Sequence, residues 1–190
     1  MAIRKIARMG HPILRGKARR VEDPRDPEVQ RLIADMIETM IDANGAGLAA
    51  PQVYVPLRLV IFQAPPDRAV ADEADAEEAF DHTAPLTVLI NPFIEVQSAE
   101  MQPGWEGCLS VPGLRGMVPR FTHIRYTGVD QYGAPIAREA RGFHARVVQH
   151  EVDHLDGVLY PARMRDLSQL IFESELPHII AAASRAVDPI

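Results

Sequence analysis

The stretch His150-Glu151-Val152-Asp153-His154 is the starting point for both the fold and the chemistry of this chain, because it places two imidazoles and a carboxylate within five residues. In a helix of about 3.6 residues per turn, side chains four positions apart lie on the same face. His150 and His154 can therefore bind one divalent metal ion, while Glu151 is angled to accept a proton from a water molecule at that ion. The spacing predicts a hydrolytic metal site on a helix.

Histidine pairs at this spacing also occur on helices that bind no metal, where the rings are solvated or packed in a core. Phe143 and Val147 favour the metal interpretation, because they continue the line of His150 and His154 at intervals of four, three and four residues. The line is an apolar stripe, so both imidazoles are expected on the inner face of the helix. Gly157 is a suitable residue for the end of that helix.

A catalytic metal site needs three protein ligands and one open position, so a third donor must come from elsewhere. Glu173 and Glu175 follow His154 at a distance where thermolysin-like zinc proteases place a carboxylate, which would make the protein an endopeptidase. Cys108 is the alternative donor. It is the only cysteine in 190 residues and cannot form an internal disulfide, although a lone cysteine is usually an inert small hydrophobe. Spacing alone leaves both ligand sets open.

Three separated segments together resemble the signature motifs of the peptide deformylase family, each without a gap. They are Gly-Ala-Gly-Leu-Ala-Ala-Pro-Gln at 45–52, Glu-Gly-Cys-Leu-Ser at 106–110 and Gln-His-Glu-Val-Asp-His-Leu-Asp-Gly at 149–157. The segment Met-Gly-His-Pro-Ile-Leu-Arg at 9–15 is also similar to the start of that family. The resemblance therefore covers nearly the whole chain.

The resemblance implies a metal centre with Cys108, His150 and His154 as ligands and the reacting water in the fourth position. It implies Fe2+ as the metal in the cell, with Zn2+, Ni2+ or Co2+ able to substitute. The chemistry of a Cys/His/His set does not by itself choose among these ions. A ferrous thiolate would be sensitive to oxygen, because a coordinating sulfur can be oxidised.

The activity implied by the resemblance is removal of the N-terminal formyl group from formylmethionyl nascent peptides, with release of formate. Glu151 would take the proton of the attacking water and give it to the departing amine. The resemblance assigns the oxyanion donors to the Leu109 backbone N–H and the Gln52 side-chain amide, and a substrate contact to Gly47. A metal-binding protein without turnover is a further alternative, which the presence of Glu151 and Gln52 disfavours.

Several residues beside the motifs have structural interpretations. Glu106 and Ser110 fit a turn and a helix cap, and we assign them no catalytic role. Asp153 fits either an ion pair with an arginine such as Arg120 or a solvated position. Trp105 is a candidate for holding the methionine side chain of the substrate, or for a place in the core.

Composition is that of a small globular enzyme, with 47% hydrophobic and 24% charged residues and a net charge of -6. We expect one catalytic domain over residues 1–190 in the cytoplasm, because one reduced cysteine and no signal peptide are found. The charge disfavours free nucleic acid as a partner, and no apolar run is long enough to cross a membrane. The ribosome is a partner of some relatives through a basic C-terminal helix, but in residues 167–190 the only basic side chains are Arg185 and His178. We expect a monomer or a weak homodimer.

The order of elements predicts an α+β fold with antiparallel β-sheets around a central metal-binding helix, flanked by N-terminal and C-terminal helices. The tail is expected to form a helix that packs on the body or on another subunit, and the acidic segment 65–85 to form a mobile surface insertion. The expected elements are a helix over 26–44, strands over 58–63 and 87–96, a hairpin of 123–130 with 134–140, and the site helix over 142–156.

Overall fold

The structure is a computed structural model and describes residues 2–66 and 82–187. Most of the acidic segment predicted as a surface insertion, residues 67–81, lies outside this description. Within the described residues, no helix is both long and apolar enough to cross a membrane.

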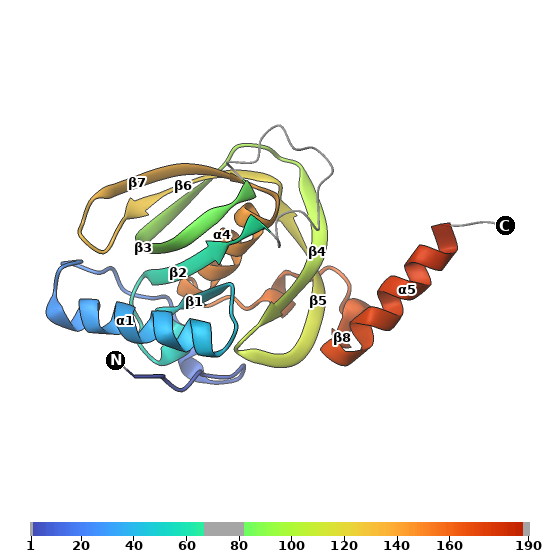
Figure 1. Cartoon of the computed structure of the whole chain (residues 1–190), viewed down its shortest axis with the longest axis horizontal. Coiled ribbons are helices and arrows are strands. Elements are labelled where there is room, and N and C mark those ends of the chain that lie inside the picture. The colour runs from blue at the N-terminus through green and yellow to red at the C-terminus, as the bar shows by residue number, and fades with distance from the viewer. Residues whose placement is uncertain (1, 67–81, 188–190) are drawn as a thin grey trace.

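In the described part of the chain, eight strands form two antiparallel sheets, and helices lie before, between and after them (Figure 1). The larger sheet has the strand order β1 (Gly47–Ala49), β2 (Leu59–Ala64), β3 (Ala84–Val96), β6 (His123–Val129), β7 (Pro135–Arg141). The smaller sheet has the order β4 (Met101–Cys108), β5 (Val111–Phe121), β8 (Leu170–Phe172). The main helices are α1 (Pro27–Asp42), α4 (Gly142–Leu155) and α5 (Leu176–Val187).

The larger sheet is covered on both faces at β2, an interior strand, which explains why that strand is almost continuously apolar. Successive side chains of a strand point to opposite faces. Leu59 and Ile61 accordingly pack in the cluster that includes α1, while Val60 and Phe62 pack in the cluster that includes α4. Helix α4 also contacts β5 of the smaller sheet, so it lies between the two sheets.

Helix α1 forms where the sequence places its capping residues and its apolar stripe. The Asp26 side chain accepts a hydrogen bond from the Glu28 backbone N–H at 2.7 Å, and Pro27 occupies the first turn. At the other end, Asn44 adopts a positive φ of 51° and the Gly45 N–H donates to the Met40 carbonyl. The predicted helix over 26–44 is confirmed.

Helix α4 differs from the predicted amphipathic helix in one respect. Every residue from His144 to Leu155 is buried, so the helix has no solvated face within that range. It contacts strands of both sheets, which leaves none of these side chains facing water. The polar residues of α4 must therefore find partners inside the protein.

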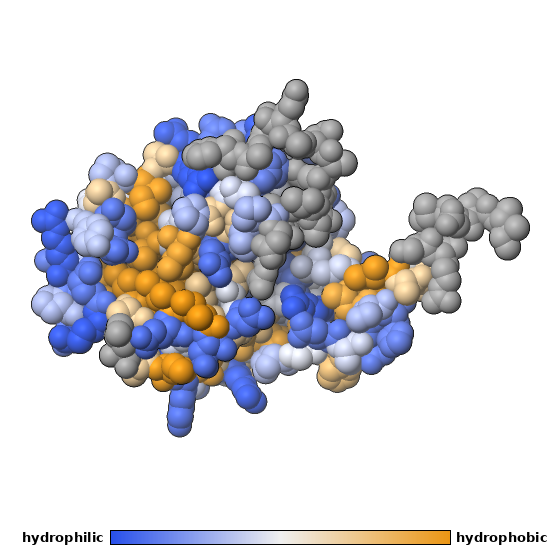
Figure 2. All heavy atoms as spheres, in the orientation of Figure 1, coloured by the Kyte–Doolittle hydropathy of each residue, from blue (hydrophilic) through white to orange (hydrophobic). Residues whose placement is uncertain are grey.

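The fold class and the predicted elements are confirmed, but the hairpin of β4 and β5 was not predicted. Its glycines and prolines, such as Pro103 and Gly104, conceal the strand pattern in the sequence. Of the two expectations for the tail helix, packing on the body does not agree with the structure, because α5 projects away from the body in Figure 1, and contact with another subunit stays a prediction. Phe172, Ile179 and Ile180 are exposed there, and Figure 2 shows hydrophobic side chains at this end of the molecule.

Candidate active site

Three side chains that could hold a metal ion come from two elements and meet between the sheets. Cys108 is the last residue of β4, and His150 and His154 lie one turn apart on α4. One ligand atom of each residue lies within 4.8 Å of the others, and Cys108 Sγ is 3.3 Å from His154 Nε2. The structure thus brings together the thiol and the two imidazoles that lie 42 and 46 positions apart in the sequence.

The surroundings of Cys108 favour the thiolate. Burial alone would raise the pKa of the thiol, but the charge of His154 and hydrogen bonds from His150 and His154 lower it well below the ordinary value. The backbone N–H of Ser110 and the side-chain Nε2 of Gln52 also point at the sulfur, at 3.4 and 3.5 Å. A thiolate is the form of cysteine that binds metal ions.

Glu106 is buried and contacts three charged or ionisable side chains next to the site. Its carboxylate accepts hydrogen bonds from Arg120 Nε at 2.8 Å and Arg146 Nη1 at 3.0 Å, and it lies 2.8 Å from His150 Nδ1. Burial would raise the pKa of Glu106, but the contacts with His150 and Arg120 lower it well below its usual range. With Nδ1 directed at this carboxylate, the other ring nitrogen of His150 is free to face Cys108.

The interpretation of Glu106 as a turn residue is therefore wrong. Glu106 belongs to β4, in the hairpin that was not predicted, and its side chain points inward onto α4. Ser110 does lie in a turn, the one that joins β4 and β5, but it caps no helix there. It is fully buried, and its hydroxyl accepts a hydrogen bond from Gln52 Nε2 at 3.1 Å.

Asp153 extends the charged contacts of Glu106 along α4. It accepts a hydrogen bond from Arg120 Nη1 at 2.6 Å and a pair from Arg163, at 2.7 and 3.1 Å. Of the two interpretations of Asp153, the ion pair with Arg120 is confirmed. Arg120 thereby bridges Glu106 and Asp153, and it is 5% exposed.

Glu151 lies against the strand β1 because Gly47 has no side chain. A Cβ atom on Gly47 would come within 2.3 Å of Glu151 Oε1. The other oxygen, Oε2, is buried and has no hydrogen-bond partner among the described residues. Burial raises the pKa of Glu151 to about 7, so this carboxylate can both take and release a proton near neutral pH.

Gln52 is held in one orientation by its neighbours. It lies in the short 3₁₀ helix Ala50–Val53, where its Oε1 accepts a hydrogen bond from the Ala49 N–H at 2.8 Å. This bond fixes which end of the amide is the oxygen, so Nε2 points toward Cys108 and Ser110. Gln52 is 1% exposed, and such a buried amide is a rigid donor.

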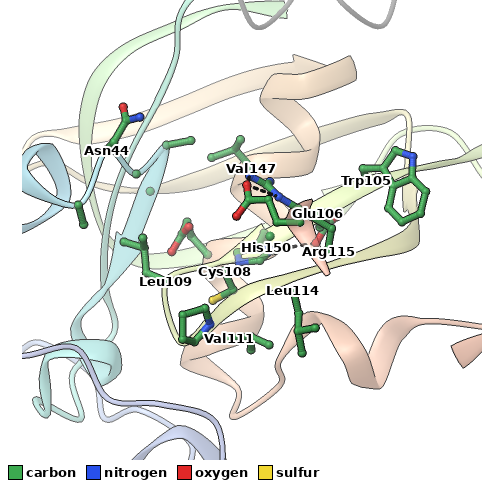
Figure 3. A pocket seen from close by; sticks show the side chains of 18 of the residues that line it. Asn44, Trp105, Glu106, Cys108, Leu109, Val111, Leu114, Arg115, Val147 and His150 are labelled. Carbon is green, nitrogen blue, oxygen red and sulfur yellow. Dashed lines mark hydrogen bonds and ion pairs between the residues drawn. The ribbon is translucent and has the colours of Figure 1, made fainter. Parts of the chain in front are cut away.

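A cavity lies beside Cys108, His150 and Glu151, and Figure 3 shows the side chains that line it. Its volume is about 760 Å³. Its wall includes all the predicted site residues except His154, together with the two candidates for the methionine side chain, Trp105 and Val147. Leu109 contributes to the wall beside Cys108, and Gly47 and Gln52 lie on the β1 side.

The carboxylates of the alternative ligand set lie elsewhere. Glu173 accepts a hydrogen bond from Arg115 Nε at 3.0 Å, and Glu175 accepts one from Ser174 Oγ. Among the described residues, neither joins the group of donor atoms formed by Cys108 and the two histidines. The ligand set of a thermolysin-like endopeptidase is therefore absent from this part of the chain.

Comparison with known proteins agrees with this geometry. The family model described as polypeptide deformylase matches residues 3–170. Peptide deformylase 2 of Bordetella bronchiseptica is 54% identical over 167 residues, which are 88% of this chain and 90% of the relative. The chain belongs to the peptide deformylase family. It is thus a metal-dependent hydrolase of protein biosynthesis that removes the N-terminal formyl group of nascent peptides.

Solved deformylase structures share the fold. The enzyme from Ehrlichia chaffeensis in complex with actinonin has a TM-score of 0.79 and 31% identity, over 89% of this chain and 92% of the other. A class I type b peptide deformylase from Acinetobacter baumannii, bound to Met-Ala-Ser, has a TM-score of 0.73 and 34% identity, over 86% and 99% of the two chains.

The donor set of this deformylase suits a metal ion. The surroundings of Cys108 lower the pKa of its thiol and favour the thiolate, and His150 is oriented through Nδ1 by the buried Glu106. His154 faces the sulfur of Cys108 through Nε2, and a buried carboxylate oxygen of Glu151 has no hydrogen-bond partner among the described residues. These are the features expected around a divalent ion with one open position.

Proposed function

We propose that this deformylase hydrolyses the formamide of formylmethionyl peptides at the centre formed by Cys108, His150 and His154. The observation that carries the proposal is the meeting of these three donor atoms within 4.8 Å, beside a cavity whose wall includes Cys108, His150 and Glu151. The products are formate and a peptide with a free methionine amine.

One divalent ion would be held by Cys108, His150 and His154, with Fe2+ as the metal in the cell and Zn2+, Ni2+ or Co2+ as substitutes. Such an ion activates water and polarises a carbonyl group. The reduced sulfur that the site requires favours a reducing compartment, and we place the enzyme in the cytoplasm.

Glu151 is the proposed general base and general acid. It takes a proton from the water whose oxygen forms the new bond to the formyl carbon, and it returns that proton to the nitrogen when the C–N bond breaks. A pKa of about 7 suits both transfers, and the unpartnered Oε2 is the atom available for them.

The developing oxyanion is stabilised, in this proposal, by the backbone N–H of Leu109 and by Nε2 of Gln52. Support comes from the locked orientation of the Gln52 amide, whose oxygen is already bonded to Ala49. A donor fixed before the reaction needs no reorganisation during it. Gly47 is assigned to the substrate contact, because it lines the cavity beside Glu151.

The substrate is a nascent peptide that begins with formylmethionine, and we assign its methionine side chain to the cavity beside Trp105 and Val147. We treat residues 1–190 as one catalytic domain, because α4 contacts both sheets. We expect a monomer or weak homodimer, without free nucleic acid or membrane as partners. Ribosome binding through α5 is disfavoured by the scarcity of basic residues over 167–190.

The decisive assay is formate release from a formyl-Met peptide by ferrous enzyme prepared without oxygen, with the metal content measured alongside. We expect formate release and no cleavage of casein. Casein cleavage without formate would favour an endopeptidase, and no reaction with either substrate would favour a binding protein.

A pair of variants tests the ligand set. Cys108→Ala should lose bound metal by elemental analysis, because one of three ligands is removed. Glu175→Ala is the matched control and should retain the metal, because Glu175 lies outside the donor group. The reverse pattern would remove Cys108 from the proposed site.

A further inference from the structure

An ion pair from the C-terminal segment lies in the wall of the substrate cavity. Arg115 of β5 donates to the Glu173 carboxylate through both Nε, at 3.0 Å, and Nη2. Both residues line the cavity, and their side chains are 36% and 52% exposed. They are therefore accessible to a peptide that enters the cavity.

Glu173 is brought to the cavity by the strand β8. That strand pairs with β5 in a register that places Ile171 opposite Arg115 and Phe172 opposite Leu114. Glu173 follows directly, as the first residue of a 3₁₀ turn that ends at Glu175. The carboxylate is thus delivered by the chain segment that completes the edge of the smaller sheet.

Arg115 lies next to the reaction centre. Its Cα is paired with that of Gly107, the residue before Cys108, across β4 and β5. A Cβ atom on Gly107 would lie only 2.7 to 2.9 Å from three atoms of the Arg115 guanidinium group. The guanidinium therefore rests on the backbone of the strand that carries Cys108, in the wall of the cavity to which the proposed function assigns the peptide.

The other charges of the cavity wall cannot reach such residues. Glu106, Arg146 and Glu151 are at most 8% exposed, and the first two are paired with each other. Among the acidic and arginine residues that line the cavity in the described chain, only Arg115 and Glu173 are open to solvent. Selectivity for charge in the peptide must therefore depend on this pair.

We propose that Glu173 is a specificity residue that makes the enzyme tolerant of acidic residues and neutral residues alike after formylmethionine. By engaging Arg115, it prevents the guanidinium from binding a substrate carboxylate. Without Glu173, Arg115 becomes a free cation beside the peptide path and selects acidic peptides. The inference rests on the proposed function, since it concerns the peptide that this site deformylates.

The test compares kcat/KM for formylated tripeptide amides that differ only in aspartate or asparagine at the second or third residue. In the wild-type enzyme we expect an aspartate-to-asparagine ratio near unity. In Glu173→Gln the ratio should rise about three- to fivefold at one of the two positions, because exposed ion pairs are worth up to about 1 kcal/mol and 1.4 kcal/mol is tenfold. The rise should shrink in about 1 M salt.

Two controls isolate the pair. Glu175→Gln removes a neighbouring acid outside the cavity wall and should leave the ratio at the wild-type value. The double variant Glu173→Gln with Arg115→Gln should also return the ratio to that value, because the freed cation is gone.

The inference is overturned if Glu173→Gln leaves the aspartate-to-asparagine ratio within about twofold of the wild-type value, or slows all peptides equally. An unchanged ratio would mean that this exposed ion pair contributes too little free energy to affect selectivity. A uniform loss would mean that Glu173 only holds the C-terminal segment in place. If the wild-type enzyme releases no formate even from the asparagine peptides, the proposed function fails instead, so the two failures are distinguishable.

Discussion

Glu106 and Glu151 are two carboxylates of one site with opposite acid–base behaviour. Burial without a partner raises the pKa of Glu151 to about 7. Glu106 is equally buried, but the contacts with His150 and Arg120 lower its pKa well below the usual range. One carboxylate is thereby suited to proton transfer, and the other favours its ionised form and orients the His150 ring.

Glu151→Gln should retain the metal and lose turnover, because the amide keeps the shape of the side chain but cannot accept the proton. We expect kcat to fall by about 100- to 10,000-fold, which is the usual contribution of a general base. Formate release and elemental analysis measure the two properties. Retained turnover would exclude Glu151 as the base.

Glu106→Gln should weaken both metal binding and folding. The variant removes the negative charge that pairs with the buried Arg120 and Arg146, which should lower the free energy of unfolding by about 3–5 kcal/mol. It also removes the carboxylate that orients His150, which should lower the metal affinity by about 10- to 100-fold. Urea denaturation and metal titration check these effects. Glu139→Gln, at an exposed ion pair with His123, is the control and should change neither.

The pH dependence of stability should also differ in Glu106→Gln. The pKa of Glu106 is lower in the folded chain than its ordinary value of 4.5. Its ionised form therefore stabilises the fold above that value, and the contribution is lost as the pH falls below it. With metal removed by a chelator, the stability gap between wild type and variant should be full at neutral pH and narrow in acid. A constant gap would contradict this account.

Strand β1 and helix α4 act together through a close approach at Gly47. The predicted role of Gly47 was a substrate contact, and the structure adds that the absent side chain makes room for Glu151. The apolar stripe of α4 was visible in the sequence, but its complete burial follows from contact with both sheets. The hairpin of β4 and β5 was missed because glycine and proline interrupt its pattern.

Gly47→Ala should lower kcat while the chain still folds. The added Cβ would displace the Glu151 carboxylate, and a shift of about 1 Å at a catalytic group can cost about 100-fold in rate. Gly16→Ala is the matched control, since its Cβ meets nothing within 4 Å and its φ is -89°. Equal activity of both variants would show that the approach does not position Glu151.

At the scale of the whole molecule, the C-terminal segment has two parts with different roles. Strand β8 completes the smaller sheet and carries Glu173 to the cavity, whereas α5 projects from the body (Figure 1). Of the two expectations for the tail helix, packing on the body does not agree with this projection, and contact with another subunit stays a prediction. The spacing of apolar residues predicts that a segment forms a helix, but it does not identify the surface against which the apolar face of that helix packs.

Removal of residues 176–190 should leave activity within about twofold and the melting temperature within about 2 °C, because surface changes away from buried contacts shift stability little. Removal of residues 167–190 also deletes β8 and should lower the melting temperature. Calorimetry and formate release on both truncations make the comparison. A large loss in the shorter truncation would assign α5 to the folded body.

Local patterns of the chain were sufficient to predict the helix of α1, the strands β2, β3, β6 and β7, the site helix and the motifs of the family. These features depend on periodicity and on residues near in sequence, so they are visible without coordinates. The tertiary structure alone decided that Glu106 orients His150, that Gly47 accommodates Glu151 and that Glu173 reaches Arg115. Such contacts depend on strand register and on the burial of charges from distant segments, and no local pattern encodes the partner of a buried charge.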